Sequence, residues 1–194
     1  LLPDEAAPLI ELNLAVVGIL DPPNKRVAID ATLYDSRVLA WSLSGDMALR
    51  SNWGDNPRFV LSVGGWNPRF EPPDDFPELD RVKAALGPPS GNPSIELTGY
   101  FAVTSNTVQA GAGIHLLATA GPAKVEGRLA FDALIQFDPF KFIVDILASL
   151  SVTIKGHGLS IKLDGTLMGP SPFRIKGKIK IKILFIKITA KVDV

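Results

Sequence analysis

The sequence contains no cysteine and only two histidines among its 194 residues. Without cysteine, the chain forms no disulfide and offers no thiolate to a metal, and the redox compartment stays undetermined. His115 and His157 each lack a second histidine at ligand spacing. We therefore interpret both as structural or solvated side chains and expect neither a metal nor a cofactor.

The sequence also lacks a net charge and a long apolar run. Lysine plus arginine equals aspartate plus glutamate at 20 each, so the total charge favours no particular partner. No run approaches the roughly 18 apolar residues that a membrane-spanning helix needs. With 46% apolar and 21% charged residues, the chain has the composition of a folded protein rather than a disordered one.

Sequence patterns of catalytic sites are missing as well. The glycine-rich stretch GAGIHLLATAG at 111–121 continues a strand pattern instead of opening a helix, so it does not fit a phosphate-binding loop. No Gly-x-Ser-x-Gly motif marks a nucleophile. The acidic pair Asp74-Asp75 is better explained by helix capping than by acid–base catalysis. We therefore predict a protein that is not an enzyme.

What the sequence does have is alternation of apolar and polar residues with a period of two, which is typical of strands. The clearest segments are 123–137, 142–154, 159–167 and 173–183, and shorter ones occur between residues 10 and 63 and from 95 to 118. Gly121-Pro122 and Gly169-Pro170 punctuate them at turn positions. These observations predict an all-β fold: an extended, mainly antiparallel meander of long amphipathic strands, forming a sandwich or a curled open sheet.

One segment favours a short helix. In DDFPELDRVKAALG, Asp75 is placed as N-cap, Glu78 completes a capping-box pattern, and Leu79, Val82 and Leu86 share one helical stripe. Gly87-Pro88 would end this helix.

The preceding stretch, GGWNPRFEPPDDFP at 65–78, gathers aromatic and proline residues. We predict that it plugs an open edge or end of the sheet, with Arg69 bound to a nearby carboxylate. The alternative is an exposed interaction loop, for which the candidate residues are Trp66, Arg69, Phe70 and Phe76.

A second candidate surface is basic. Lys176, Lys178, Lys180 and Lys182 alternate with isoleucines, and residues 174–194 carry seven basic residues and one acidic residue. Such a ladder is typical of a solvated sheet face, and the alternative is a surface for phosphate, lipid headgroups or acidic protein. The ladder lacks aromatic residues that would stack on bases, so we expect no nucleic acid.

Several phrases resemble a known family. SVGGWNPRFEPPDDFPELDR, GRLAFDALIQFDPFKFIVDILASLSV and LDGTLMGPSPFRIKGK are similar to stretches of large, mostly bacterial proteins that form an uncharacterised family, over residues 58–185. The resemblance implies a β architecture and an internal portion of a longer chain. It brings no catalytic residues.

The expected organisation is an N-terminal β segment at 1–93, with the aromatic and proline loop and the helix, followed by a long-stranded meander at 94–194. Both form one continuous domain cut from a longer protein. An amphipathic sheet must cover its apolar face. We expect a structural or scaffold module covered by other parts of the same chain or by copies of itself. The alternatives are a hydrophobic gutter that binds or transfers lipid, and a segment of an outer-membrane β-barrel. The compartment stays open.

Overall fold

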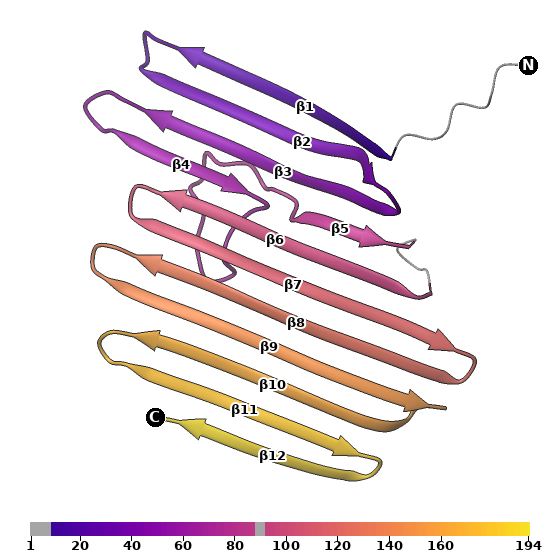
Figure 1. Ribbon diagram of the computed structural model, residues 1–194. Helices are drawn as coiled ribbons and strands as arrows, with labels where there is room; N and C mark the ends of the chain where they lie inside the picture. The colour runs from indigo at the N-terminus through magenta and orange to yellow at the C-terminus, as the bar shows by residue number, and fades with distance from the viewer. Residues whose placement is uncertain (1–8, 88–91) are drawn as a thin grey trace, which may run out of the picture.

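The protein is built from twelve strands in one sheet, as seen in a computed structural model that describes residues 9–87 and 92–194 (Figure 1). The strands are β1 (Ile10–Asp21), β2 (Arg26–Val38), β3 (Trp41–Asn52), β4 (Arg58–Val63), β5 (Val82–Leu86), β6 (Ser94–Thr104), β7 (Thr107–Ala120), β8 (Ala123–Gln136), β9 (Lys141–Ile154), β10 (His157–Gly169), β11 (Arg174–Ile183) and β12 (Ile186–Asp193).

The sheet is an antiparallel meander in which neighbours in sequence are neighbours in space. The order runs from β1 to β12 without a crossover, except that β5 shares with β4 the place between β3 and β6. β1 and β12 lie at opposite edges (Figure 1). The prediction of an all-β antiparallel meander is confirmed, and of its two forms the described residues adopt the open sheet rather than the sandwich. The sheet continues across residue 93, because β4 and β5 both pair with β6.

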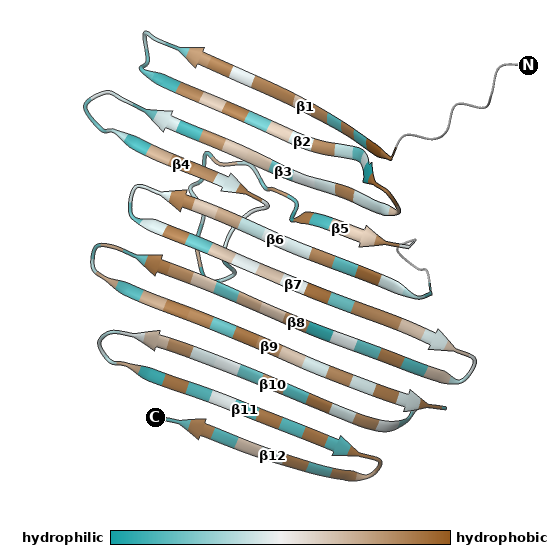
Figure 2. Cartoon of the chain, viewed as in Figure 1, coloured by the Kyte–Doolittle hydropathy of each residue, from teal (hydrophilic) through white to brown (hydrophobic). Residues whose placement is uncertain are grey.

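The period-two pattern divides the sheet into two faces. Antiparallel pairing places directly opposite residues on the same side. Phe131 on β8 therefore pairs with Ile146 on β9, and the neighbouring Asp132 pairs with Asp145 on the other side. The alternation of apolar and polar residues is visible along most strands (Figure 2). We call the side of Phe131 and Ile146 the apolar face and the side of Asp132 and Asp145 the polar face.

The predicted helix at 75–86 is wrong. The described residues contain no helix, and hence none long and apolar enough to cross a membrane. Val82–Leu86 is β5, which pairs with β3 on one side and β6 on the other. The Asp75 carboxylate binds Arg58 at 2.8 Å instead of capping a helix. Two ladders of hydrogen bonds satisfy this backbone better than an isolated short helix, which is marginal in water. The expected end at Gly87-Pro88 lies partly outside the described residues.

The best-buried cluster lies on the polar face rather than the apolar one. Ala48, Val60 and Phe76 form it, with Trp66 and Leu79 packed around them. Ala48 and Val60 are strand residues of β3 and β4, whereas the other three come from the segment between β4 and β5. This segment therefore supplies the second layer that the sheet otherwise lacks.

Candidate functional site

The segment at 64–81, between β4 and β5, folds over the polar face, and we call it the plug. Its three aromatic rings pack together: Trp66 stacks on Phe70 with ring centroids 5.0 Å apart and meets Phe76 edge-on at 5.0 Å. Phe76 is only 8% exposed, and the Arg50 guanidinium lies over its ring at 5.6 Å. The aromatic residues thus cover an interior part of one face, not an edge or end of the sheet as expected.

Buried polar groups fix the position of the plug. The backbone N–H of Asn67 donates a hydrogen bond of 3.0 Å to Gln109 Oε1 on β7. Gln109 in turn donates to the Thr107 hydroxyl at 3.1 Å. Asn67 and Gln109 are both buried, so their loss would leave unpaired groups in the interior. Asn67 Oδ1 also accepts the N–H of Arg69 at 2.9 Å, which holds the turn closed.

Two ion pairs tie the plug to the sheet. Arg69 binds the Asp145 carboxylate of β9 through two hydrogen bonds, of 2.6 and 2.9 Å, and Thr166 donates to the same carboxylate at 2.5 Å. The Arg69 hydrogen bond lowers the pKa of Asp145, with the Thr166 hydroxyl adding to the effect. Asp75 binds Arg58 of β4 in the same two-bond manner, and this hydrogen bonding lowers the pKa of Asp75.

A third contact attaches the plug to the sheet: the Arg81 guanidinium, the Tyr100 ring and the Asp132 carboxylate lie in a row. The Arg81 guanidinium stands 3.8 Å from the centre of the Tyr100 ring, and its nitrogens donate to the carbonyls of Gly64 and Trp66. The Tyr100 hydroxyl donates to Asp132 at 2.9 Å. Burial raises the pKa of Tyr100, as does the hydrogen bond to Asp132, while burial lowers the pKa of Arg81. The row is a packed structural contact, without a free nucleophile.

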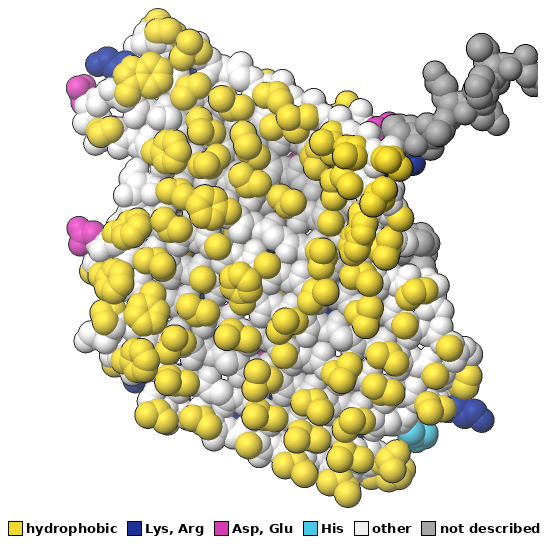
Figure 3. Space-filling view, in the orientation of Figure 1, with side chains coloured by type: hydrophobic (Ala, Val, Ile, Leu, Met, Phe, Trp, Pro, Cys, Tyr) yellow, Lys and Arg dark blue, Asp and Glu magenta, His cyan; other side chains and the backbone are white. Residues whose placement is uncertain are grey.

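Among the described residues, no such layer covers the apolar face. In the space-filling view apolar side chains spread over nearly the whole visible face (Figure 3). Large side chains in the middle of the sheet remain well exposed, such as Leu129 at 53% and Ile146 at 46%. A shallow hollow of about 600 Å³ lies among them. Its larger lining side chains are Leu97, Ile114, Leu129, Phe131, Val144 and Ile146.

The lysine ladder lies on the polar face of β11, where the alternation places it. Several of its cross-strand partners are also lysines: Lys180 is directly opposite Lys162 on β10, and Lys178 lies between Lys191 on β12 and Asp164 on β10. Lys182 is likewise opposite Lys187. Repulsion by Lys180, and to a lesser degree by Lys191, lowers the pKa of Lys178. We call the polar side of β10–β12 the basic face.

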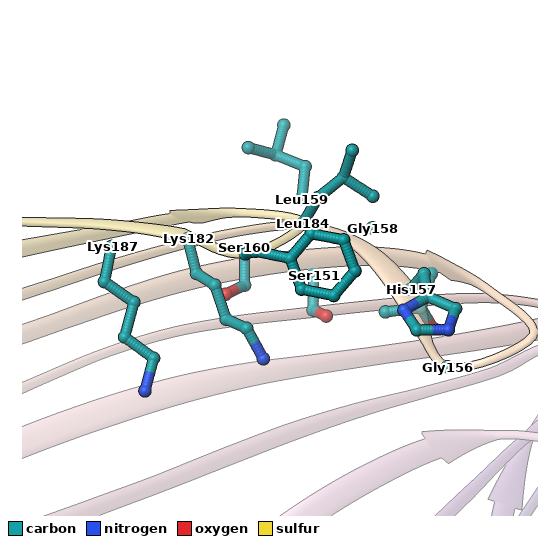
Figure 4. A pocket seen from close by; sticks show the side chains of 11 residues that line it. Ser151, Gly156, His157, Gly158, Leu159, Ser160, Lys182, Leu184 and Lys187 are labelled. Carbon is teal, nitrogen blue, oxygen red and sulfur yellow. The ribbon is translucent and has the colours of Figure 1, made fainter.

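A pocket of about 490 Å³ lies at the end of this basic face (Figure 4). Lys182 and Lys187 extend from the same side of the sheet, beside the hydroxyls of Ser151 and Ser160, whereas Leu159 and Leu184 project from the opposite side. The rings of His157 and Phe185 approach each other with centroids 6.1 Å apart. The pocket therefore combines ammonium groups, hydroxyls and an aromatic ring.

The structure separates the two predicted sets of site residues. Trp66, Arg69, Phe70 and Phe76 come together in the plug, while the four ladder lysines follow β11. Whether either set binds a partner stays a prediction. Asp132 and Asp145 were not singled out from the sequence. Counting outward from the turn at 137–140 would have paired them, and two opposed carboxylates need nearby cations.

Chemistry of other kinds is not assembled in the part of the chain that the structure describes. No three histidine, aspartate or glutamate side chains gather there as a metal-binding group. His115 binds Glu126 at 3.1 Å, and Glu126 also contacts Lys124 and Arg128. Hydrogen bonding, chiefly from Lys124, lowers the pKa of Glu126 to about 2. This carboxylate is therefore the centre of a surface ion-pair cluster.

These features define a class: an all-β protein made of one open antiparallel sheet, with one face plugged and the other apolar and left uncovered by residues 9–87 and 92–194. More particularly, the chain belongs to a family described as "Family of unknown function (DUF6603)", whose model matches residues 1–193. No curated protein and no solved structure matches the chain.

Proposed function

We propose that this protein is a non-enzymatic structural module whose apolar face packs against a second apolar sheet. The second sheet comes from another copy or from another part of the same longer chain. The observation that carries the proposal is the uncovered apolar face. Such a face in water is costly, since each Å² of apolar surface removed from water contributes about 25 cal/mol.

The total exposed area supports a missing partner. The chain exposes 12975 Å². A compact monomer of 20.8 kDa exposes roughly 8,900 Å² by the usual scaling of area with mass. The excess of about 4,000 Å² is too large to attribute to surface roughness of an ordinary domain.

The dimensions of the face favour a sheet as its occupant. Eleven strand positions spaced about 4.8 Å apart, with strands about 40 Å long, give roughly 2,000 Å². This is more than twice the roughly 800 Å² that each partner contributes to a standard specific interface. It falls in the range of obligate assemblies, in which apolar faces of two sheets pack about 10 Å apart.

The plug, on the polar face, also supports a missing layer on the apolar face. It closes the centre of the polar face with aromatic packing, buried hydrogen bonds and ion pairs. The polar face thus needs no further cover, and the missing layer belongs on the apolar face.

Light scattering coupled to size-exclusion chromatography tests the proposal on the chain itself. We expect the wild-type protein to elute as a dimer or larger particle. Ile146→Lys places a charge in the apolar face and should shift the particle toward the monomer. Ser149→Lys, on the polar face of the same strand, should leave the assembly unchanged.

A soluble wild-type monomer at all concentrations, with the same mass as Ile146→Lys, would overturn self-assembly. Equal effects of the two lysine substitutions would indicate a general loss of folding rather than a loss of the interface. Circular dichroism on both variants separates these outcomes.

A second candidate function is lipid binding, favoured by the hollow of about 600 Å³ on the apolar face. Ligand pockets commonly measure 300–1,000 Å³ and are lined mostly by apolar side chains. Mass spectrometry of organic extracts should then recover lipid from the wild-type protein and less from Phe131→Lys. Protein free of lipid, purified without detergent, would count against this candidate.

The structural proposal also includes the origin of this chain: we propose that it is part of a large bacterial protein.

A further inference from the structure

The β11–β12 hairpin ends in two exposed apolar residues. Leu184 and Phe185 form its two-residue turn, and their side chains are 52% and 87% exposed. Ile183 and Ile186, which flank the turn, are also exposed. Two-residue hairpin turns normally use glycine, asparagine or aspartate, because their backbone requires positive φ.

Leu184 adopts a φ of 50°, a region that a branched apolar residue rarely occupies. The adjacent hairpin between β9 and β10 has a glycine, Gly156, at the second position of its turn, while its first turn residue, Lys155, also adopts a φ of 50°. The apolar turn therefore carries both a backbone cost and an exposure cost. The contact between the Phe185 and His157 rings, with centroids 6.1 Å apart, still leaves Phe185 87% exposed.

The charged residues beside this turn are also arranged unfavourably. Lys182 and Lys187 flank the turn directly opposite each other, and like charges in such pairs destabilise a sheet. The pairs Lys180 with Lys162 and Lys178 with Lys191 continue the pattern away from the turn, where Asp164 forms an ion pair with Lys162. Five lysines of the β11–β12 hairpin form no ion pair with a carboxylate among the described residues: Lys178, Lys180, Lys182, Lys187 and Lys191.

The neighbouring hairpin adds to this end of the sheet. The Leu184 N–H donates to the Gly158 carbonyl at 3.0 Å, so the two turns lie side by side. Lys155 is exposed at the second turn. Lys182 and Lys187 line the pocket (Figure 4), and Phe185 is another of its lining residues. Exposed apolar side chains and a group of cations are thus gathered at one end of the sheet, with Leu184 on one side and Lys182 and Lys187 on the other (Figure 4).

We propose that this end of the sheet docks on an anionic membrane surface. Leu184 and Phe185 enter the boundary between headgroups and acyl chains, and Lys155, Lys182 and Lys187 contact lipid phosphates and carboxylates. An amphipathic element with apolar and basic parts is suited to such a boundary. Lysines close to an anionic leaflet each strengthen binding by about fivefold.

An anionic membrane accounts for both the exposed apolar turn and the lysines without carboxylate partners. An acidic protein would neutralise the lysines but would leave Phe185 exposed or require a matching apolar pocket. A soluble phosphate ester would occupy the pocket but would not cover Leu184, which projects from the opposite side of the sheet (Figure 4). Only a surface with charge above an apolar layer meets the turn and the lysines at once.

Vesicle co-sedimentation tests the proposal with the full chain. We expect binding to vesicles of equal parts phosphatidylcholine and phosphatidylserine, weak binding to phosphatidylcholine alone, and loss of binding at high salt. Leu184→Gly with Phe185→Ser preserves a favourable hairpin turn and should weaken binding by roughly tenfold or more. Lys182→Gln with Lys187→Gln should weaken it by roughly twenty-five-fold.

The matched control is Lys25→Gln with Lys83→Gln, which removes the same charge from the N-terminal half and should leave binding unchanged. Equal binding to both vesicle types, unaffected by the turn variant, would overturn the proposal and assign binding to the apolar face. Absence of vesicle binding by the wild-type protein would also overturn it. Saturable binding of free glycerol phosphate by calorimetry, lost in the lysine variant, would reassign the pocket to a soluble ligand.

Discussion

At the scale of single residues, Gly111 makes the Tyr100 contact possible. A Cβ at Gly111 would overlap the Tyr100 ring and approach Asp132 Oδ1 to 2.8 Å. The ring therefore lies directly on the backbone of β7, held there by Arg81 above and Asp132 beside it. This glycine is required by packing, since its φ is not in the left-handed region.

Gly111→Ala should consequently displace the Tyr100 ring and destabilise the chain by about 1–3 kcal/mol, the usual cost of overpacking. Urea unfolding followed by circular dichroism measures the loss. The control is Gly127→Ala, whose added Cβ would meet its nearest neighbour at an ordinary 3.9 Å. Gly127→Ala should change stability by no more than about 0.5 kcal/mol. Equal losses in both variants would contradict the account.

The Arg69–Asp145 pair predicts how the plug responds to acid. Because the folded-state pKa of Asp145 lies below its ordinary value of 3.8, the pair stabilises the folded chain fully above that value. This stabilisation is lost as the pH falls through the lowered pKa. Asp75, whose pKa is lowered in the same direction, acts in the same pH range.

The plug should therefore stay closed at pH 5 and loosen below about pH 4. Fluorescence of Trp66, in a chain carrying Trp41→Phe and Trp53→Phe, reports the change. Asp145→Asn should weaken the plug at neutral pH and reduce the amplitude of the acid transition. An unchanged acid transition in Asp145→Asn would show that the ion pair does not hold the plug.

For Arg69, the sequence predicted the type of its binding partner, a carboxylate, but not which residue supplies it. Arg69, in the aromatic and proline stretch, was expected to bind a nearby carboxylate. That carboxylate is Asp145, which is 76 residues away in sequence and comes close only because β9 crosses beneath the plug. Gln109 and Tyr100 gave no signal, because a polar residue at a polar position of a strand looks solvated until a second layer covers it.

At the scale of elements, the strands were predictable and the plug was only partly so. Alternation fixes the side of each residue, so β8 to β11 follow the expected segments closely. Residues 75–86 contain capping and helical spacing, but β5 gains backbone partners on both sides. Tertiary pairing outweighed the local signal, which is a weak prior in a short segment.

Phe76 is the residue on which the plug depends most, since it is buried against Ala48 and Val60. Phe76→Ala should cost about 3 kcal/mol through lost burial and the cavity left behind. Phe140→Ala, whose ring is 54% exposed, should cost less than about 1 kcal/mol. Denaturant midpoints measure both. A small loss for Phe76→Ala would mean that the plug is only loosely attached.

At the scale of the whole molecule, the two faces differ in how they are covered. The plug covers part of the polar face, while the apolar face resembles half of a sandwich core. A sequence pattern can show that a sheet has one apolar face, but it does not show what covers that face. The alternation is the same whether the cover is a second sheet or lipid, so fold class was predictable and the occupant was not.

Because the chain has no cysteine, single introduced thiols can report the cover directly. Leu129 and Arg128 are neighbours on β8, face opposite sides, and are both exposed in the single chain. The decisive measurement is the rate at which a thiol reagent modifies Leu129→Cys and Arg128→Cys in the purified assembly. The account predicts rapid modification at 128 and strong protection at 129. Equal, rapid rates at both positions would contradict it.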